Sequence, residues 1–455
     1  MNDLDTVLSH IDARRDAHLA RLMDYLRHPS ISAHDIGIRE VADMLVGMLG
    51  QLGMQAEAIA TSGHPMVLAR RCPHPDRPTV LFYGHYDVQP PEPLDAWDSP
   101  PFEPTIRNGR IYARGAGDNK GQHFAQILAV EAWLAAQGEL PCNLIILLEG
   151  EEEIGSPHIA EFVRNHAARL AADLVITADG PLHPSGKPIV LFGVRGMVGF
   201  DLVAQTGRSD AHSGNHGGTM PNALWTLVHL LGSMKSADGT ITIDGLLDPI
   251  LPPGAAELAA ARALPVDVPG YLAEMELAQL DAPEDRAFHD RLMFHPTLTI
   301  NGLHGGYDGP GSKTVLPCRA VAKCDIRLVP GMTPDQALDC VRAHVARHAP
   351  GVEVIARGGM LPSRTPIASP YTAPIVDAIR AARDQDPYLT PCAGGSLPNY
   401  VFTDILGLPA FSVPYANADE ANHAPNENLE VELFHAGIRT GAALLDRLRA
   451  FPKAD

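Results

Sequence analysis

Short apolar runs alternate with a helix-forming segment in the first half of this chain, and this alternation limits its fold more than any other feature. Residues 79–83, 143–148 and 173–177 are apolar runs of strand length. Residues 121–136 lie between the first two runs, and their apolar side chains recur at helical spacing. Strands that are apolar throughout are typical of parallel sheets covered by helices. The pattern predicts an α/β domain with a largely parallel sheet flanked by helices.

The N-terminal region adds helices and a hairpin. Apolar residues at helical spacing predict a helix over 5–27 and another over 38–52. Asn108-Gly109 separates residues 105–107 from residues 110–112, which is a signal for a β-hairpin.

The middle of the chain has a different pattern. Strands are expected at 198–204, 296–301 and 315–328, and helices at 220–234 and 334–347. From about residue 365 the alternation of helix and strand resumes, and it ends in a helix near 431–449.

These patterns predict one α/β domain interrupted by an insertion, in a chain of 455 residues that is too long for a single compact core. Residues 1–196 and 365–455 would form the α/β domain. Residues 197–364 would form an inserted α+β domain.

Charge and cysteine content argue against several classes of protein. The formal net charge is −19 and no basic stripe is present, so we expect no nucleic-acid partner. No run approaches the roughly 20 apolar residues of a membrane helix, and the polar N-terminus lacks a secretory signal. We therefore expect a cytoplasmic protein without a membrane partner. None of the six cysteines lies in a C-x-x-C pair, so a metal site would use His, Asp and Glu.

Metal-type ligands follow the predicted strands directly. Active sites of open α/β sheets form at the carboxyl ends of strands, where segments far apart in sequence can meet. In residues 84–88, an extended backbone directs His85 and Asp87 to the same side. A zinc-bound imidazole usually donates its second N–H to a carboxylate, a role that suits Asp87. A capping Asp beside a surface His explains the pair about equally well.

Two further segments contain candidate carboxylate ligands. Asp118 ends a glycine-rich stretch before a helix, where an N-cap is the simpler interpretation, although glycines also permit the close backbone approach of a bridging carboxylate. The run at 149–153 places neighbouring glutamates after a buried strand, where each raises the pKa of the next. This run fits either a solvated turn or a site with one metal-binding glutamate and one general base.

Asp179 and His423 also follow predicted strands, but each is a weak signal alone. An aspartate at a strand end is usually a turn former, and a loop histidine is more often solvated.

Taken together, these segments resemble one known family. The motifs are G-H-x-D-V-x-P at 84–90, G-R-I-Y-A-R-G-x-x-D-x-K-G at 109–121, E-E-x-G-S at 152–156 and x-H-x-P-N-E at 422–427. They are similar to motifs of the zinc-dependent exopeptidases, which include carnosinases, cytosolic dipeptidases, glutamate carboxypeptidase, aminoacylase and succinyl-diaminopimelate desuccinylase. Their order and spacing match over nearly the whole chain.

The resemblance implies a centre with two Zn²⁺ ions per subunit, for which Mn²⁺ or Co²⁺ could substitute. His85 and Asp179 would bind one ion, and Glu153 and His423 the other. Asp118 would bridge both ions.

The same resemblance assigns the residues around the metals. Asp87 would orient His85, and Glu152 would be the general base. In the family the base and the ligand stand directly before x-G-S, which leaves Glu151 outside the site. The resemblance also implies a cis peptide after Asp118, where this chain has Asn119 in place of the usual acidic residue.

The inserted domain resembles a lid and dimerisation domain. His212, within residues 209–214, would reach the active site of a partner subunit in a homodimer. For His212 the alternative is a histidine in a plain turn. Four other residues resemble a substrate-carboxylate site, and for Arg327 among them the alternative is a surface ion pair. These residues are Thr314, Arg327, Gly395 and Ser396.

The resemblance implies hydrolysis of an amide bond in a dipeptide or other short peptide with a free C-terminal carboxylate, by a metal-activated water. A deacylase of N-acyl amino acids would use the same metals and water. The segment 240–290 resembles the larger dipeptidase-like members, which favours a dipeptidase. A scaffold without catalysis is the third hypothesis, and the presence of every expected ligand and of the base argues against it.

Overall fold

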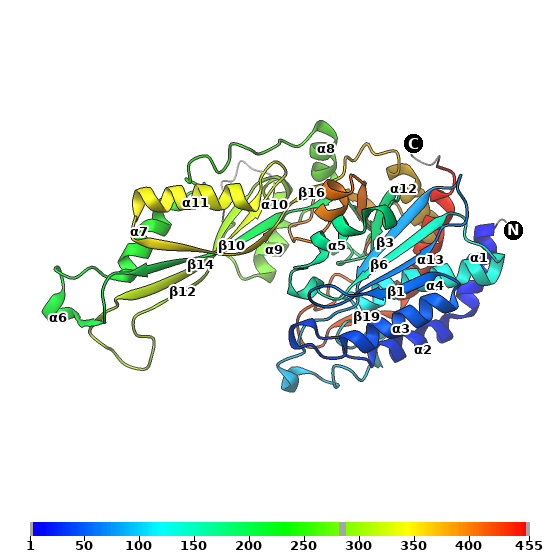
Figure 1. The fold of residues 1–455 in the computed structure, drawn as a ribbon, viewed down its shortest axis with the longest axis horizontal. Coiled ribbons are helices and arrows are strands. Elements are labelled where there is room, and N and C mark those ends of the chain that lie inside the picture. The colour runs from blue at the N-terminus through cyan, green and yellow to red at the C-terminus, as the bar shows by residue number, and fades with distance from the viewer. Residues whose placement is uncertain (1–2, 282–287, 452–455) are drawn as a thin grey trace. The chain divides into compact units, whose positions relative to one another are not determined.

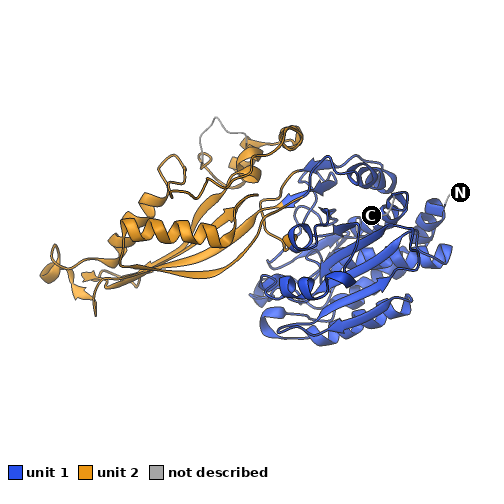
Figure 2. Cartoon of the chain, turned by 45° about the horizontal axis from the view of Figure 1, so that its top comes forward, with its two compact units in different colours: residues 1–193, 365–390, 401–455 blue, residues 194–364, 391–400 orange. Residues whose placement is uncertain are grey.

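The computed structural model describes residues 3–281 and 288–451 and divides into two compact units (Figure 2). Unit 1 comprises Met1–Gly193, Thr365–Thr390 and Val401–Asp455. Unit 2 comprises Val194–Arg364 and Pro391–Tyr400. Residues 391–400, which the sequence pattern places in the 365–455 segment, therefore group with unit 2.

Unit 1 is built around an eight-stranded mixed sheet with the order β1-β2-β6-β3-β7-β18-β8-β17 (Figure 1). Parallel pairing joins β3 to β6 and β7, β7 to β18, and β8 to β17, whereas β1, β2 and β6 pair antiparallel. The predicted α/β class is confirmed, with a sheet that is parallel at its centre. The strands are β1 (Gln55–Ile59), β2 (Met66–Arg71), β3 (Thr79–His85), β6 (Asn143–Glu149), β7 (Leu174–Thr177), β8 (Ile189–Leu191), β17 (Tyr388–Thr390) and β18 (Ala410–Ser412).

Helices pack on this sheet and on one another around one hydrophobic core. They are α1 (Asp3–Ala13), α2 (Arg15–Leu26), α3 (Ile38–Gln51), α4 (Lys120–Gln137), α12 (Thr372–Arg383) and α13 (Val431–Leu448). A further helix, α5 (Ile159–Asn165), packs on the helical turn Val401–Ile405. The prediction of one helix over 5–27 is wrong, because the helix breaks at Arg14. No large apolar residue lies between Ile11 and Leu19. Both helices pack on α4, and α1 also packs on α13.

The central strands bring their carboxyl ends together. β3, β6 and β7 are buried along their whole lengths, as their continuous apolar sequences predict. The register pairs His85 with Glu149 and Tyr83 with Thr177. The loops that follow these strands therefore leave the sheet at one edge, which is where the predicted ligands lie.

A three-stranded sheet joins the hairpin to the late loop of the chain. The hairpin consists of β4 (Thr105–Arg107) and β5 (Arg110–Tyr112), and its turn residues Asn108 and Gly109 have φ angles of 50° and 76°. This confirms the predicted turn. β5 also pairs antiparallel with β19 (Asn428–Glu430), so the segments on either side of β5 and β19 lie side by side.

Unit 2 has its own core beneath a four-stranded antiparallel sheet, β12-β14-β10-β15. Helices α7 and α11 pack on this sheet (Figure 1). The main elements are β10 (Gly196–Gln205), α7 (Ala223–Met234), α8 (Ala255–Ala263), α9 (Val268–Glu274), α10 (Phe288–Phe294), β12 (Thr297–Gly305), β14 (Arg319–Leu328), α11 (Pro334–His348) and β15 (Val352–Met360). The short elements are β9 (Gly193–Val194), β11 (Ala211–His212), α6 (Ser213–His216), β13 (Val315–Leu316) and β16 (Ser363–Arg364).

Two predicted boundaries in unit 2 need correction. The strand predicted over 315–328 is interrupted after Leu316, because Pro317 has no N–H to donate to a neighbouring strand. The helix predicted from residue 220 begins at Ala223, because the side chain of Asn222 caps it by accepting from the N–H groups of Leu224 and Trp225. Residues 282–287 of the predicted 240–290 insertion lie outside the described residues. Among the described helices, none is long and apolar enough to cross a lipid bilayer.

Candidate metal centre

Two carboxylates face one ring nitrogen of His85, the last residue of β3. Its ring is fully buried, and Nδ1 lies 3.1 Å from the carbonyl oxygen of Asp87 and 3.4 Å from its carboxylate. Nδ1 therefore carries the hydrogen in the neutral ring, and Nε2 presents a lone pair. Nε2 lies 3.0 Å from Oδ1 of Asp118 and 3.5 Å from Oδ2 of Asp179.

Asp118 lies between two histidines that come from opposite ends of the chain. Its Oδ1 faces His85, and its Oδ2 lies 3.0 Å from Nε2 of His423. The same nitrogen of His423 lies 3.1 Å from Oε2 of Glu153. Two groups of potential ligand atoms result, His85–Asp118–Asp179 and Asp118–Glu153–His423, each with all its atoms within 4.8 Å of one another. All five side chains belong to unit 1.

The donor set fits divalent metal ions. A lone pair of His85 facing two buried carboxylate oxygens is repulsive unless a cation lies between them. Oδ2 of Asp179 is itself buried, with no hydrogen-bond partner among the described residues. Imidazole and carboxylate are the ligands that Zn²⁺ accepts when cysteine is absent, and a shared carboxylate is typical of two-metal centres.

The pKa values of His423, Glu153 and His85 are all raised, which means that the cluster favours additional positive charge. The carboxylates of Asp118 and Glu153 raise the pKa of His423 to about 10. Burial, followed by the charge of Asp118, raises the pKa of Glu153 to about 7. Burial lowers the pKa of His85, but contacts with Asp118 and its neighbouring carboxylates outweigh it and hold that pKa well above the usual value. Without metal, this cluster would take up protons in place of cations.

Asp87 links the candidate ligand His85 to the 3₁₀ turn Glu152–Ile154. Besides facing His85, its carboxylate accepts from the backbone N–H of Glu152 at 3.1 Å and of Glu153 at 3.0 Å. These bonds satisfy the first amides of the 3₁₀ turn Glu152–Ile154. Asp87 is fully buried and so fixes the ring of His85 and the position of both glutamates.

The three glutamates of the turn have different surroundings. Burial raises the pKa of Glu152 well above its usual value, and the negative charges of Asp179 and Glu153 raise it further. Glu151 points elsewhere: its carboxylate contacts Nδ1 of His158 at 2.7 Å and accepts from the N–H of His64 at 3.0 Å. The geometry therefore agrees with leaving Glu151 outside the site.

A buried ion pair, which the sequence pattern did not reveal, holds two ligand-bearing loops together. Arg114 donates to Glu427 at 2.7 Å, and both side chains are at most 1% exposed. The carboxylate of Glu427 also accepts from the backbone N–H groups of Gly115, Gly117 and Asp118, each at 3.0 Å. Arg114 and Glu427 lie within the family-like motifs at 109–121 and 422–427, but the motifs do not show that the two side chains pair. The peptide Asp118–Asn119 is cis, as the resemblance implies.

In unit 2, His212 and Thr314 lie next to each other. Nδ1 of His212 accepts from the N–H of Gly214 at 3.0 Å, which leaves the hydrogen of a neutral ring on Nε2. Nε2 lies 3.4 Å from Oγ1 of Thr314. His212 is exposed, so its ring N–H can reach a ligand.

Arg327 and Ser396, also in unit 2, form a second pair. Nη1 of Arg327 donates to Oγ of Ser396 at 2.9 Å, and its Nε lies 3.7 Å from Asp325. Gly395 is exposed beside Ser396, with open space where a side chain would be. The structure thus brings the predicted substrate-binding residues together in two pairs within unit 2.

Comparison with known proteins identifies the family. The model of peptidase family M20/M25/M40 matches residues 81–447, a span that contains every candidate ligand. The chain belongs to this peptidase family. It is therefore a hydrolase with peptidase activity, as the sequence motifs indicate.

Individual relatives agree with this assignment. The Cys-Gly metallodipeptidase dug1 of Schizosaccharomyces pombe is 30% identical, over 96% of this chain and 96% of its own length. Human Beta-Ala-His dipeptidase is 32% identical, over 83% of this chain and 76% of its own. Among solved structures, the M20 family metallo-carboxypeptidase Sso-CP2 from Sulfolobus solfataricus superposes with a TM-score of 0.90 at 32% identity, covering 95% of this chain and 99% of that one.

Proposed function

We propose that this protein is a di-zinc dipeptidase that cleaves the amide bond of dipeptides or other short peptides with a free C-terminal carboxylate. The observation that carries the proposal is Asp118, which presents one carboxylate oxygen to each of two histidines at 3.0 Å. The dipeptidase names of its relatives support the substrate class over N-acyl amino acids.

The residues of unit 1 have distinct tasks in this proposal. Bound zinc would lower the pKa of water from about 15.7 to near 7 and polarise the scissile carbonyl. Glu152 accepts the proton of the attacking water and returns it to the departing amine, because its raised pKa suits both transfers. Asp87 holds His85 and the backbone of Glu152 at fixed positions.

The residues of unit 2 bind the rest of the substrate. Arg327 pairs with the C-terminal carboxylate, since a guanidinium can make two hydrogen bonds to it. Ser396, Gly395 and Thr314 add polar contacts to that end. His212, acting across a dimer, donates its Nε2 hydrogen to the oxyanion that forms on the carbonyl.

A panel of substrates tests the proposal directly. Zinc-loaded protein should hydrolyse dipeptides with a higher kcat/KM than N-acetyl amino acids of the same C-terminal residue. The reverse preference would favour the deacylase, and no hydrolysis of either set would contradict the proposal.

Metal content should be two ions per chain in the active protein. Because Asp118 faces both histidines, its replacement by alanine should lower the content of both ions. Inductively coupled plasma mass spectrometry after dialysis measures this. One ion per chain in fully active wild-type protein would rule out the bridging role of Asp118.

Substitution of Arg327 by alanine should raise KM for dipeptides by about 10- to 100-fold, the effect of losing a charge-assisted hydrogen bond. Dipeptide amides, which lack the carboxylate, should be affected far less. Arg319→Ala, at the other end of β14, is the matched control and should leave both KM values unchanged. Equal losses for acids and amides would refute the carboxylate contact.

We also propose that the functional unit is a homodimer formed through unit 2. β12 is an edge strand with unpaired backbone groups, and its Ile300 is 51% exposed. On α7, Trp225 is 60% exposed and Val228 42% exposed. A second copy of this edge and helix would cover both apolar surfaces.

Substitution of Trp225 by glutamate should therefore convert dimers to monomers at micromolar concentration, because the carboxylate would be buried in the interface. Light scattering coupled to size-exclusion chromatography gives the mass. Leu251→Glu, at an apolar position that is 53% exposed and lies outside α7 and β12, should remain dimeric. A monomeric wild-type protein would disprove the dimer.

A further inference from the structure

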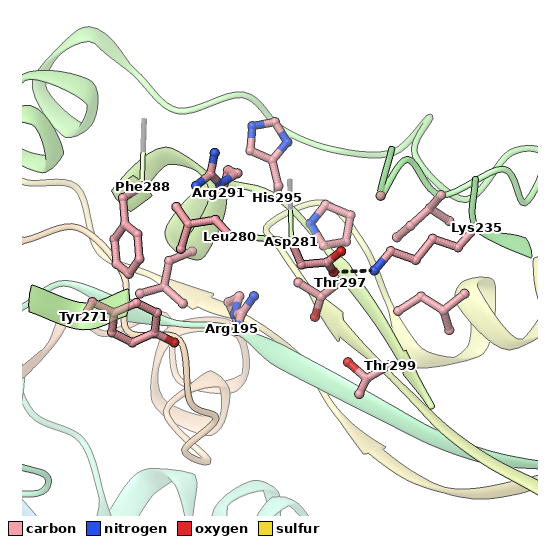
Figure 3. A pocket seen from close by; sticks show the side chains of 15 residues that line it. Arg195, Lys235, Tyr271, Leu280, Asp281, Phe288, Arg291, His295, Thr297 and Thr299 are labelled. Atoms are coloured by element: carbon pink, nitrogen blue, oxygen red, sulfur yellow. Dashed lines mark hydrogen bonds and ion pairs between the residues drawn. The ribbon is translucent and has the colours of Figure 1, made fainter. Parts of the chain in front are cut away.

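Unit 2 contains a pocket of about 400 Å³ that does not include any of the predicted substrate-binding residues (Figure 3). Its walls come from α9, α10, the first residues of β12 and the residues directly before β10 and after α7. The volume lies in the range of small-molecule sites. Both charged and apolar side chains line the pocket, which indicates what it could bind.

Three cationic side chains line the pocket: in Figure 3, Arg291 lies beside Phe288, Arg195 near the middle and Lys235 at the far side. Arg195 is 7% exposed, and its Nε donates to the carbonyl of Gly394 at 2.9 Å. Its Nη1 is buried and finds no acceptor among the described residues. A buried guanidinium nitrogen without an acceptor is costly, so the pocket suits an anion at Arg195.

Aromatic and aliphatic side chains also line the pocket. The rings of Tyr271 and Phe288 meet edge to face, with centroids 5.5 Å apart. Leu280 and Leu292 line the same cavity. Figure 3 shows Arg195 between these rings and Lys235. An occupant would therefore place an apolar body against the rings and its charged group toward Arg195.

Of the three cations that line the pocket, Arg195 is the one with a buried nitrogen that finds no acceptor among the described residues, whereas Arg291 has an interaction of its own. Lys235 is already paired with Asp281 at 2.9 Å, so it does not contribute a free cation. The carboxylate of Asp281, which lines the same pocket, would repel the several charges of a polyphosphate more than the single charge of a carboxylate at the guanidinium of Arg195. We propose that this pocket binds a small organic carboxylate with an aromatic or aliphatic body, at a site separate from the one that hydrolyses peptides.

The site borders a substrate-binding segment without sharing its contacts. Arg195 holds the carbonyl of Gly394, one residue before Gly395, whereas Arg327 contacts Ser396. A carboxylate on Nη1 would fix the guanidinium and, through its Nε, the backbone at Gly394. Occupancy of the pocket should therefore change KM for dipeptides.

The test uses 4-phenylbutyrate, which has no amide bond to hydrolyse, titrated calorimetrically into the metal-loaded protein. We expect a Kd of about 1 mM or tighter, and binding at least about tenfold weaker for 4-phenylbutan-1-ol, which lacks the charge. Two substitutions in the Lys235–Asp281 ion pair should act in opposite directions. Lys235→Met leaves Asp281 unpaired and should weaken binding about threefold or more, and Asp281→Asn frees Lys235 and should tighten it by a similar factor.

Three results would overturn the proposal. The first is the absence of binding by wild-type protein. The second is equal affinity for acid and alcohol. The third is a Kd that Arg327→Ala raises while Lys235→Met and Asp281→Asn leave it unchanged, because that would place the carboxylate at the peptide site. Opposite shifts in the two variants at unchanged basal kcat would support the separate site.

Discussion

Glu152→Gln should lower kcat by about 10²- to 10⁴-fold, the usual contribution of a general base, while the metal content stays at the wild-type level. The amide has nearly the same shape as the carboxylate but cannot accept the proton of water. The backbone N–H of residue 152 would still donate to Asp87, so the turn and the neighbouring ligand Glu153 should keep their positions. Steady-state kinetics and metal analysis on the same preparation measure both quantities.

Glu151→Gln is the matched control, because it makes the same change one residue earlier. The carboxylate of Glu151 is engaged by His158 and by the N–H of His64, away from the metal ligands. We expect it to keep most of its kcat, with a cost in thermal stability from the weakened contact to His158. If Glu151→Gln were inactive and Glu152→Gln nearly normal, the assignment within the glutamate run would be off by one residue.

The sequence predicted the sheet where local patterns and tertiary packing agree. The runs at 79–83 and 143–148 are apolar throughout because β3 and β6 are buried on both faces. It did not predict β1, whose pattern is mostly exposed, or β15, whose middle is open to solvent, and it also missed β2, whose first four residues are buried. It also joined α1 to α2, because helical spacing continues across Arg14 although the backbone does not. Contacts with residues distant in sequence determine where a helix breaks, and the spacing of apolar residues carries no information about those contacts.

The candidate site could be predicted segment by segment, but not its supporting contacts. Each proposed ligand follows a strand or sits in a motif, but position alone left other interpretations open, and the family resemblance selected His85, Asp118 and Asp179 as ligands. The pairing of Arg114 with Glu427 joins residues 313 apart and depends on β5 lying beside β19. The spacing of residues along the chain does not predict a contact between side chains so far apart in sequence.

Glu427→Gln should destabilise the protein by about 3 to 5 kcal/mol, the usual cost of leaving one partner of a buried ion pair uncompensated. Arg114 is 1% exposed and would face a neutral amide. The same carboxylate holds three backbone N–H groups of the loop that ends at Asp118, so an amide can replace only part of these bonds. Metal affinity should also fall by about 10- to 100-fold, as is typical when a partner that orients a ligand is lost.

Glu430→Gln separates this effect from a general loss of charge in the same segment. Glu430 pairs with Arg110 at 2.9 Å, but its side chain is 38% exposed, so its loss should cost at most about 1 kcal/mol. Denaturant unfolding of the metal-loaded and metal-free forms distinguishes two roles for Glu427. If it only stabilises the fold, Glu427→Gln lowers both midpoints equally. If it positions Asp118, the variant also loses part of the stabilisation that metal gives, because weaker binding adds less free energy to the native state.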